Sequence, residues 1–223
     1  MLLAEDLLLL LTDDATGKLL LPAEQVDIAL GGANLLELTL LERVSLDEGK
    51  HVVVFDPSST GDPTLDGALG VIGTRQGRKP KAVVEPLGEN LRTTLYVRLV
   101  AEGVLRAEER KVLGIFPVHR WPAARAEHEE RMRAQLTQVL VQGTTPDSRT
   151  AELVSLLHAL KSEHRILNPK KHGLTRKDLA TRAEEVSPGD WASEAVQEAI
   201  EAVMAAVIFG GKVLFGYQGR TLP

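Results

Sequence analysis

The stretch "DIALGGANLLELTLLE", residues 27–42, decides the fold of this chain. Its apolar residues occupy almost every side of the helix that the spacing predicts, and a helix that is hydrophobic all round is buried. Asp27 is expected to cap the first turn of this helix. Gly31 and Gly32 lie inside it, where each glycine costs about 1 kcal/mol relative to alanine. We therefore expect a central helix that another helix or a ligand approaches closely.

A leucine-rich stretch, "LLAEDLLLLLTDDATGKLLL" at residues 2–21, precedes the central helix. Its first charges are Glu5 and Asp6, whereas a secretory signal has a cationic start. Asp13 and Asp14 end the apolar run far short of the roughly 20 residues that span a membrane. The stretch is expected to form a short buried helix followed by a turn at "DDATG", and neither to span a membrane nor to direct export.

Hairpins and amphipathic helices are predicted after residue 42. Two β-prone segments, residues 43–46 and 51–55, flank the turn signal "DEGK". The segment "KVLGIFP" and the turn signal "VHRWP", together residues 111–122, indicate a second hairpin. A flexible basic loop, "TRQGRKPK", is expected over residues 74–81. Helices are expected over residues 65–72, 87–105, 123–141, 147–166, 175–186 and 191–208.

These segments predict a mainly α-helical protein. We expect a helical bundle with surrounding amphipathic helices and two small β-hairpins, forming a single domain over residues 1–223. With 43% hydrophobic residues, the chain of 223 residues can bury a sizeable core. It contains no cysteine, which excludes disulfides and thiolate metal sites.

No motif indicates catalysis or metal binding. His128 and Glu129 match the start of the H-E-x-x-H motif of zinc proteases, but Met132 occupies the position of the second histidine. His158 and His164 are six residues apart, which places them on different faces of a helix. No nucleophile elbow and no phosphate-binding loop with a lysine is present. We expect no enzymatic activity, no cofactor and no metal ion.

The order of the segments resembles the Golgi phosphoprotein 3 family. The resemblance runs from the "LLLLL" helix through an acidic turn to "ALGGANLLELTLLERVSL", then to a helix ending "LVAEGVL" and a hairpin. Its most specific residues are Gly32, Leu35, Glu37, Leu38 and residues 103–105. It implies a non-enzymatic peripheral membrane adaptor, whose eukaryotic members bind phosphatidylinositol 4-phosphate. The alanine-, arginine- and leucine-rich composition is typical of a bacterial member.

The resemblance also implies where an anionic lipid headgroup would bind. The family uses a tryptophan, an arginine and two basic residues spaced i, i+3, and these positions hold Pro22, Gly31, Glu89 and Arg92 here. Only Arg92 keeps its cation, although a phosphate monoester with about −1.5 to −2 charges needs several donors. We therefore expect altered headgroup binding, without a strong preference for phosphatidylinositol 4-phosphate.

Other cations are candidates for a rebuilt headgroup site. The formal net charge of −5 requires that any anionic partner meet a local basic patch. Besides Arg92, the candidates are Arg98, Arg75, Arg78, Lys79 and Lys81. The alternative role for Arg92 is a solvent-exposed ion pair with Glu89, three residues away on one face of a helix.

The second hairpin, residues 108–122, is the other functional segment that the resemblance implies. In the family this element mediates self-association and is thought to touch lipid. Here its apolar residues are Val112, Ile115, Phe116 and Trp121, with His119 and Arg120 near the expected tip. A tryptophan beside an arginine suits a membrane interface or a partner groove. We expect an exposed hairpin and a homo-oligomer.

Two alternatives to the adaptor stay open. A helix over residues 87–102 followed by a hairpin is also the order of a winged-helix nucleic-acid binder, although Glu89 and Glu102 balance its arginines. The other alternative is an interaction scaffold without a ligand. In each case we expect a cytoplasmic protein, and the adaptor would be peripheral on the inner face of a membrane.

Overall fold

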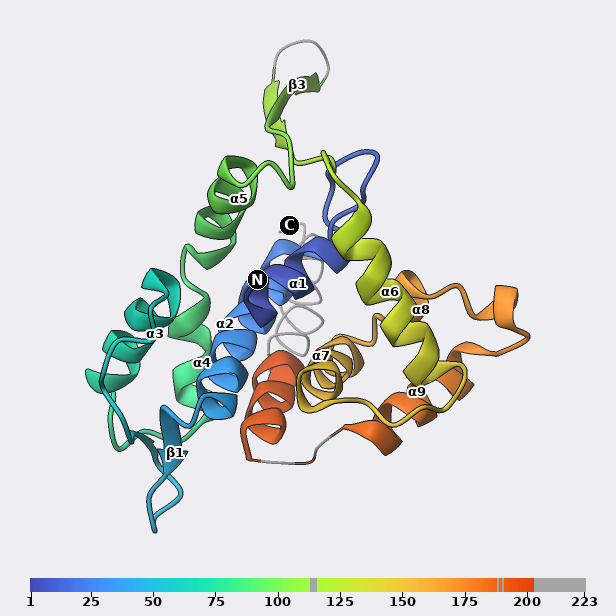
Figure 1. Cartoon of the computed structure of the whole chain (residues 1–223). Helices are drawn as coiled ribbons and strands as arrows, with labels where there is room; N and C mark the ends of the chain where they lie inside the picture. The colour runs from blue at the N-terminus through green and yellow to red at the C-terminus, as the bar shows by residue number, and fades with distance from the viewer. Residues whose placement is uncertain (113–115, 188, 190, 203–223) are drawn as a thin grey trace, which may run out of the picture.

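The computed structural model of the chain describes residues 1–112, 116–187, 189 and 191–202. Helices predominate, and two antiparallel two-stranded sheets accompany them, as the sequence predicted. Figure 1 shows α2 (Ala23–Leu40) in the middle of the molecule with α1 (Leu3–Leu10) beside it. On one side lie α3 (Pro63–Gly73), α4 (Lys81–Gly88) and α5 (Leu91–Ala101). On the other side lie α6 (Glu127–Leu140), α7 (Ser148–Ala159), α8 (Glu163–Ile166) and α9 (Arg176–Val186).

The central helix α2 is buried as its sequence predicts. Its residues 28–38 are all buried, and their apolar side chains join those of α1 in one hydrophobic cluster. The helix begins earlier than expected, because Pro22 occupies its N-cap position with a backbone angle φ of −55°. The prediction that Asp27 caps the helix is therefore wrong, and the carboxylate of Asp27 is available for another partner.

The leucine-rich stretch forms the buried helix α1, as predicted, and it buries charge as well. Glu37 on α2 and Asp6 on α1 both accept hydrogen bonds from Arg149 of α7, at 2.6 and 2.9 Å. The second oxygen of Glu37 accepts the backbone N–H of Leu3. His128 of α6 lies 2.7 Å from the other oxygen of Asp6. The acidic residues of these two helices therefore connect four helices around the core.

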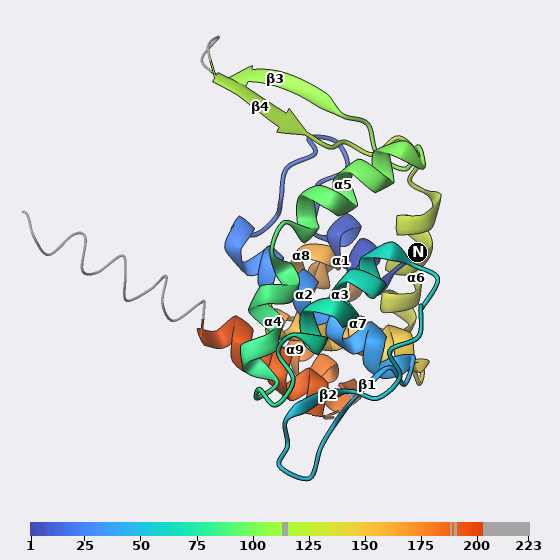
Figure 2. The same ribbon diagram turned by 90° about the vertical axis from the view of Figure 1, so that its left-hand side faces the viewer.

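Both predicted hairpins are present. Strands β1 (Val44–Leu46) and β2 (Val52–Val54) pair antiparallel, and so do β3 (Glu108–Val112) and β4 (Phe116–Arg120). Figure 2 shows the β3–β4 hairpin projecting from one end of the molecule and the β1–β2 hairpin at the opposite end. Because β4 extends to Arg120, the prediction of a turn at residues 118–122 is wrong. The connection at 113–115, which includes Ile115, lies outside the described residues.

The helix predicted over residues 87–105 is two helices, α4 and α5. Asn90 separates them with a left-handed φ of 59°, a conformation that asparagine adopts more readily than most residues. Pro86 lies in the last turn of α4 and lacks the N–H that a continuous helix would use. The prediction of one helix across Glu89 and Arg92 is therefore wrong.

The remaining helices follow the prediction with shifted bounds: α3 is longer than predicted, and α6 and α9 are shorter. The helix expected over 147–166 is interrupted after α7 at Lys161, which has a φ of 52°, and α8 follows. The basic loop before α9 contains a short 3₁₀ helix, η1 (Pro169–His172). Residues 191–202 are helical, and the rest of the helix predicted over 191–208 lies outside the described residues.

Candidate functional site

The four headgroup positions implied by the resemblance lie around the junction of α2, α4 and α5. Pro22 is the N-cap residue of α2, and Gly31 lies within the same helix. Glu89 is the C-cap residue of α4, and Arg92 lies in the first turn of α5. The fold thus assembles the expected location, but the side chains there differ from those that the family uses.

Close packing explains the glycine at position 31. A Cβ atom on Gly31 would lie 2.3 Å from the carbonyl oxygen of Val84 in α4, and one on Gly88 would lie 2.2 Å from the carbonyl oxygen of Asp27. Both distances are far below van der Waals contact, so the two backbones touch along this line. An arginine at position 31 would have no space in this arrangement, and a headgroup site of the family type cannot be rebuilt there.

Arg92 is bound by a carboxylate from α2. Its Nε donates to Asp27 Oδ1 at 2.7 Å and its Nη2 donates to Asp27 Oδ2 at 3.3 Å, the two-point geometry that guanidinium and carboxylate groups favour. The hydrogen bond to Asp27 raises the pKa of Arg92. Glu89 is exposed at the end of α4 and does not share a helix face with Arg92. The predicted Glu89–Arg92 ion pair is therefore wrong, because the chain turns at Asn90.

Arg98, another candidate cation, is held inside the fold. Its Nη1 donates to Asp62 at 2.6 Å and its Nε donates to Glu102 at 3.1 Å. The Nε also lies 2.9 Å from Oε1 of the fully buried Glu5. Burial raises the pKa of Glu5, while the nearby guanidinium opposes that shift. Arg98 therefore balances a buried carboxylate at the start of α1, which is a structural role.

The basic segment before α4 has free cations. Arg75, Arg78, Lys79 and Lys81 are all exposed, and within the described part of the chain no carboxylate lies within 4 Å of them. Backbone hydrogen bonds hold the segment against β2, since Val52 N–H donates to the carbonyl of Arg78 at 2.9 Å. Lys79 Nζ donates to the carbonyl of Gly49 in the β1–β2 turn at 2.8 Å. The predicted flexible loop is thus anchored to the first hairpin, and Lys81 belongs to α4.

The base of the β3–β4 hairpin is tied to the helices by Trp121. Its ring stacks on Tyr96 of α5 with centroids 4.7 Å apart, and the Tyr96 hydroxyl lies 3.0 Å from Thr12 Oγ1. The backbone at Gly17 packs directly against that of Trp121. Trp121 itself is therefore half-buried, because the core takes up part of its ring, whereas the hairpin that extends from this base projects from the molecule as expected (Figure 2).

His119 and Arg120 lie at the base of this hairpin and not near its tip. In the register of β3 and β4 they pair with Glu109 and Glu108. The ring of His119 lies 6.2 Å from that of Trp121. Val112 and Phe116 are backbone partners in the last described pair before residues 113–115. The prediction that His119 and Arg120 mark the tip is wrong, since the turn lies earlier in the chain.

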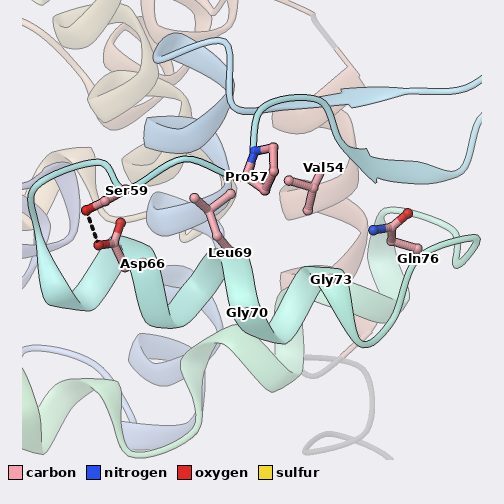
Figure 3. Close-up of a pocket in the computed structure, with 8 residues that line it drawn as sticks. All are labelled: Val54, Pro57, Ser59, Asp66, Leu69, Gly70, Gly73 and Gln76. Carbon is pink, nitrogen blue, oxygen red and sulfur yellow. Dashed lines mark hydrogen bonds between the residues drawn. The ribbon is translucent and has the colours of Figure 1, made fainter.

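A hollow of about 430 Å³ lies between α3 and the segment after β2 (Figure 3). Its ionisable lining residue, Asp66, accepts hydrogen bonds from Ser59 Oγ at 2.6 Å and from Thr60 N–H at 2.7 Å. These bonds, the Ser59 hydroxyl above all, lower the pKa of Asp66. Asp66 thus holds the 59–66 loop in place, and the rest of the lining is Val54, Pro57, Leu69, Gly70, Gly73 and Gln76. Among the described residues that line this hollow there is no acid–base pair.

Neither a metal site nor a membrane-spanning helix is present among the described residues. Across them, no three or more His, Asp or Glu side chains are grouped to hold a metal ion. None of the described helices has the length and apolar character that crossing a bilayer requires. The sequence missed Asp27 as the partner of Arg92 and Tyr96 as the partner of Trp121. Asp27 and Arg92 are 65 positions apart in the chain, and Tyr96 and Trp121 are 25 apart, so no local sequence pattern indicates either contact.

A buried central helix, surrounding amphipathic helices and a projecting hairpin define the class of this protein, a mainly α-helical bundle with an appended β-hairpin. The chain belongs to the Golgi phosphoprotein 3 (GPP34) family, whose model matches residues 3–203. A comparison with curated proteins gave no match.

Proposed function

We propose that this protein is a non-enzymatic peripheral membrane adaptor that binds anionic lipid surfaces through the basic segment before α4. The observation that carries the proposal is a set of exposed cations that have no carboxylate partner among the described residues, Arg75, Arg78, Lys79 and Lys81. Each basic residue close to an anionic bilayer contributes about 1 kcal/mol of attraction. Four of them can therefore hold a protein of negative net charge on such a surface.

The state of Arg92 supports binding without selectivity for phosphatidylinositol 4-phosphate. A phosphate monoester would have to displace Asp27 from the guanidinium of Arg92, and the neighbouring positions 22, 31 and 89 supply no further cation. The cations of the basic segment, in contrast, lie on exposed side chains without a carboxylate partner among the described residues. Such a surface responds to charge density and has little geometric preference for one headgroup.

Self-association through the β3–β4 hairpin is the second part of the proposal. The hairpin projects from the end of the molecule opposite the basic segment (Figure 2), so a partner bound there would leave the basic segment free. The outer edges of β3 and β4 have no strand partner among the described residues. Unpaired edges are able to pair with a second copy of the chain.

A nucleic-acid-binding role has less support. In a winged-helix protein α5 would be the recognition helix in the major groove, and its two arginines would contact the DNA. Arg92 and Arg98 are both paired with carboxylates, so α5 offers no free cationic face. A positively charged surface is the main source of affinity for nucleic acid.

Vesicle flotation tests the membrane proposal. We expect the full chain to float with vesicles of phosphatidylcholine and phosphatidylglycerol, to remain behind with phosphatidylcholine alone, and to lose binding as salt rises. The variant Arg75→Gln/Arg78→Gln should lower the partition constant by about 25-fold, since each lost charge removes about 1 kcal/mol.

A second basic segment supplies the matched control. Lys170 and Lys171 are exposed in η1, and Lys170→Gln/Lys171→Gln changes the net charge by the same amount. We expect this control to bind nearly as the wild type does. Equal losses in both double variants would contradict the assignment to the basic segment before α4, and no flotation with phosphatidylglycerol vesicles would contradict membrane binding itself.

A further inference from the structure

A cleft of about 390 Å³ separates the basic segment from the helix at residues 191–202. One wall comes from the β1–β2 hairpin and the start of α4, which lie beside that helix at the lower end of the molecule in Figure 2. The other wall is the helix itself. The charged and aromatic residues that line the cleft are Lys50, Lys79, Lys81, Trp191, Glu194 and Glu198.

The two walls carry opposite charges. Lys50, Lys79 and Lys81 lie on one wall, and Glu194 and Glu198 lie on the other. Among the described residues no ion pair closer than 4 Å connects the walls, although both sets of side chains are long. Opposite charges that line one cleft without meeting leave room for a ligand between them.

The fold positions Lys79 to contact a ligand in the cleft. Its Nζ donates to the carbonyl of Gly49 at 2.8 Å, which ties the α3–α4 connection to the β1–β2 turn where Lys50 lies. An ammonium group has three donors, so two remain for a ligand. The lysine wall is therefore built from two segments held together by this contact.

Trp191 adds an aromatic surface next to the glutamates. Its ring is half-buried against the hydrophobic core and also lines the cleft. The face of a tryptophan ring attracts cations, and it binds organic ammonium groups better than other aromatic rings do. With two carboxylates on the same helix, the second wall is suited to an ammonium group.

We propose that this cleft binds a small phosphate ester that also carries an ammonium group, with phosphate at the lysine wall and ammonium between Trp191 and the two glutamates. Phosphoethanolamine is the simplest group of this kind. A simple anion would meet repulsion from Glu194 and Glu198, and a simple cation would meet repulsion from the three lysines. A ligand that carries both charges makes favourable contacts with the lysines and with the glutamates. The cleft volume is in the range of small-molecule sites.

Calorimetric titration of the full chain with glycerophosphoethanolamine tests the proposal without a membrane. We expect this compound to bind about tenfold more tightly than glycerol 3-phosphate and than ethanolamine, because each of these loses one of the two charge-assisted contacts. In a Trp121→Phe background, Trp191 is the remaining tryptophan, and its fluorescence should change on binding. This result would place the ligand in the cleft.

Charge variants separate the two walls. Glu194→Gln/Glu198→Gln should lower the affinity for glycerophosphoethanolamine about tenfold while leaving or improving that for glycerol 3-phosphate. Lys50→Gln should weaken both. The controls are Glu201→Gln on the same helix and Arg75→Gln in the basic segment, which do not line the cleft and should bind as the wild type does.

Two results would overturn the proposal. One is the absence of heat and of a Trp191 signal with glycerophosphoethanolamine. The other is glycerol 3-phosphate binding as tightly as glycerophosphoethanolamine in the wild type, which would make the cleft a simple anion site. Once binding is found, flotation with vesicles of phosphatidylcholine and phosphatidylethanolamine distinguishes a lipid headgroup from a free phosphate ester as its source. Phosphatidylglycerol flotation tests the membrane proposal separately, so each proposal can fail alone.

Discussion

At the residue scale, the contact between Asp27 and Arg92 determines what the guanidinium of Arg92 in α5 has available for a ligand. The pair joins α2 to α5, and both side chains are only partly buried. A partly exposed ion pair of this kind contributes about 1 kcal/mol or less to stability. Its larger consequence is electrostatic, because the carboxylate cancels the charge of the arginine toward any anion outside.

The variant Asp27→Asn tests this masking. The amide oxygen can still accept a hydrogen bond, but the guanidinium regains its net charge, so we expect binding to phosphatidylglycerol vesicles to rise about fivefold. The double variant Asp27→Asn/Arg92→Gln removes both charges and should bind as the wild type does. Glu130→Gln, an exposed acidic residue on α6, is the control for net charge. Weaker binding of the double variant than of the wild type would contradict the masking.

His158 gives a second prediction at this scale. Its Nδ1 lies 2.8 Å from Oε1 of the buried Glu163, and this hydrogen bond raises the pKa of His158. The raised pKa means that the folded state binds the proton more tightly than the unfolded state does. The stabilisation is complete below the ordinary pKa of 6.5 and is lost as pH rises through the higher folded value.

We therefore expect the free energy of unfolding of His158→Gln to differ most from that of the wild type below pH 6.5. Denaturant unfolding at pH 5.5 and pH 9 measures this, and the wild type should lose more stability than the variant between the two. The difference arises from His158 and Glu163, so other titrating groups cancel between the two proteins. A pH-independent gap would show that the imidazolium contributes nothing.

At the element scale, the contact of α2 with α4 fixes the geometry around Asp27 and Arg92. Gly31 and Gly88 let the two backbones approach, and Asp27 lies next to the contact, one turn before Gly31. The glycines of α3 differ, because Gly70 faces open space. Glycine therefore permits close packing in α2, whereas in α3 it only lowers the stability of the helix.

Alanine substitutions measure this difference. Gly31→Ala should lower the free energy of unfolding by about 1–3 kcal/mol, the range for overpacking a close contact. Gly70→Ala should raise it by about 0.5–1 kcal/mol, because it removes the cost of glycine in a helix without a clash. Thermal or urea denaturation of both variants checks the signs. Destabilisation by Gly70→Ala as large as that by Gly31→Ala would contradict the assignment of close packing to α2 and α4.

At the scale of the whole molecule, the two proposed surfaces lie at opposite ends, with the β3–β4 hairpin at one and the basic segment with its cleft at the other (Figure 2). Between them, Arg149, Arg98 and their carboxylate partners tie the helices to α1 and α2. This separation allows self-association and membrane binding to be removed independently.

Shortening the hairpin tests self-association. Arg110 and Val118 are partners in the register, so residues 111–117 can be replaced by Asn-Gly, which favours a tight hairpin turn. Trp121 keeps its stacking on Tyr96, so the variant should fold. Light scattering after gel filtration should show an oligomer for the wild type and a monomer for the variant. An oligomer of unchanged size in the variant, or a wild-type monomer at every concentration, would contradict the proposal.

Local sequence patterns were enough to predict most elements of this protein, but not the helix breaks at Asn90 and Lys161. The all-round apolar pattern of residues 27–42 predicted the buried α2, and the leucine run predicted the buried α1 because periodicity and charge are local properties. The two hairpins and the mainly helical class followed in the same way, and the ordered segments indicated the family before the fold was known. The basic segment could also be found, since its cations are neighbours in the chain.

Tertiary structure alone decided which side chains are free to act. Arg92 and Asp27 are 65 residues apart, and no local pattern shows that one neutralises the other. Trp121 appeared suited to an interface until its stacking on Tyr96 placed part of it in the core. Lys50 and Glu194 line one cleft only because the chain folds back over more than half its length. Secondary structure depends on neighbours in sequence, whereas ion pairing, burial and clefts depend on neighbours in space.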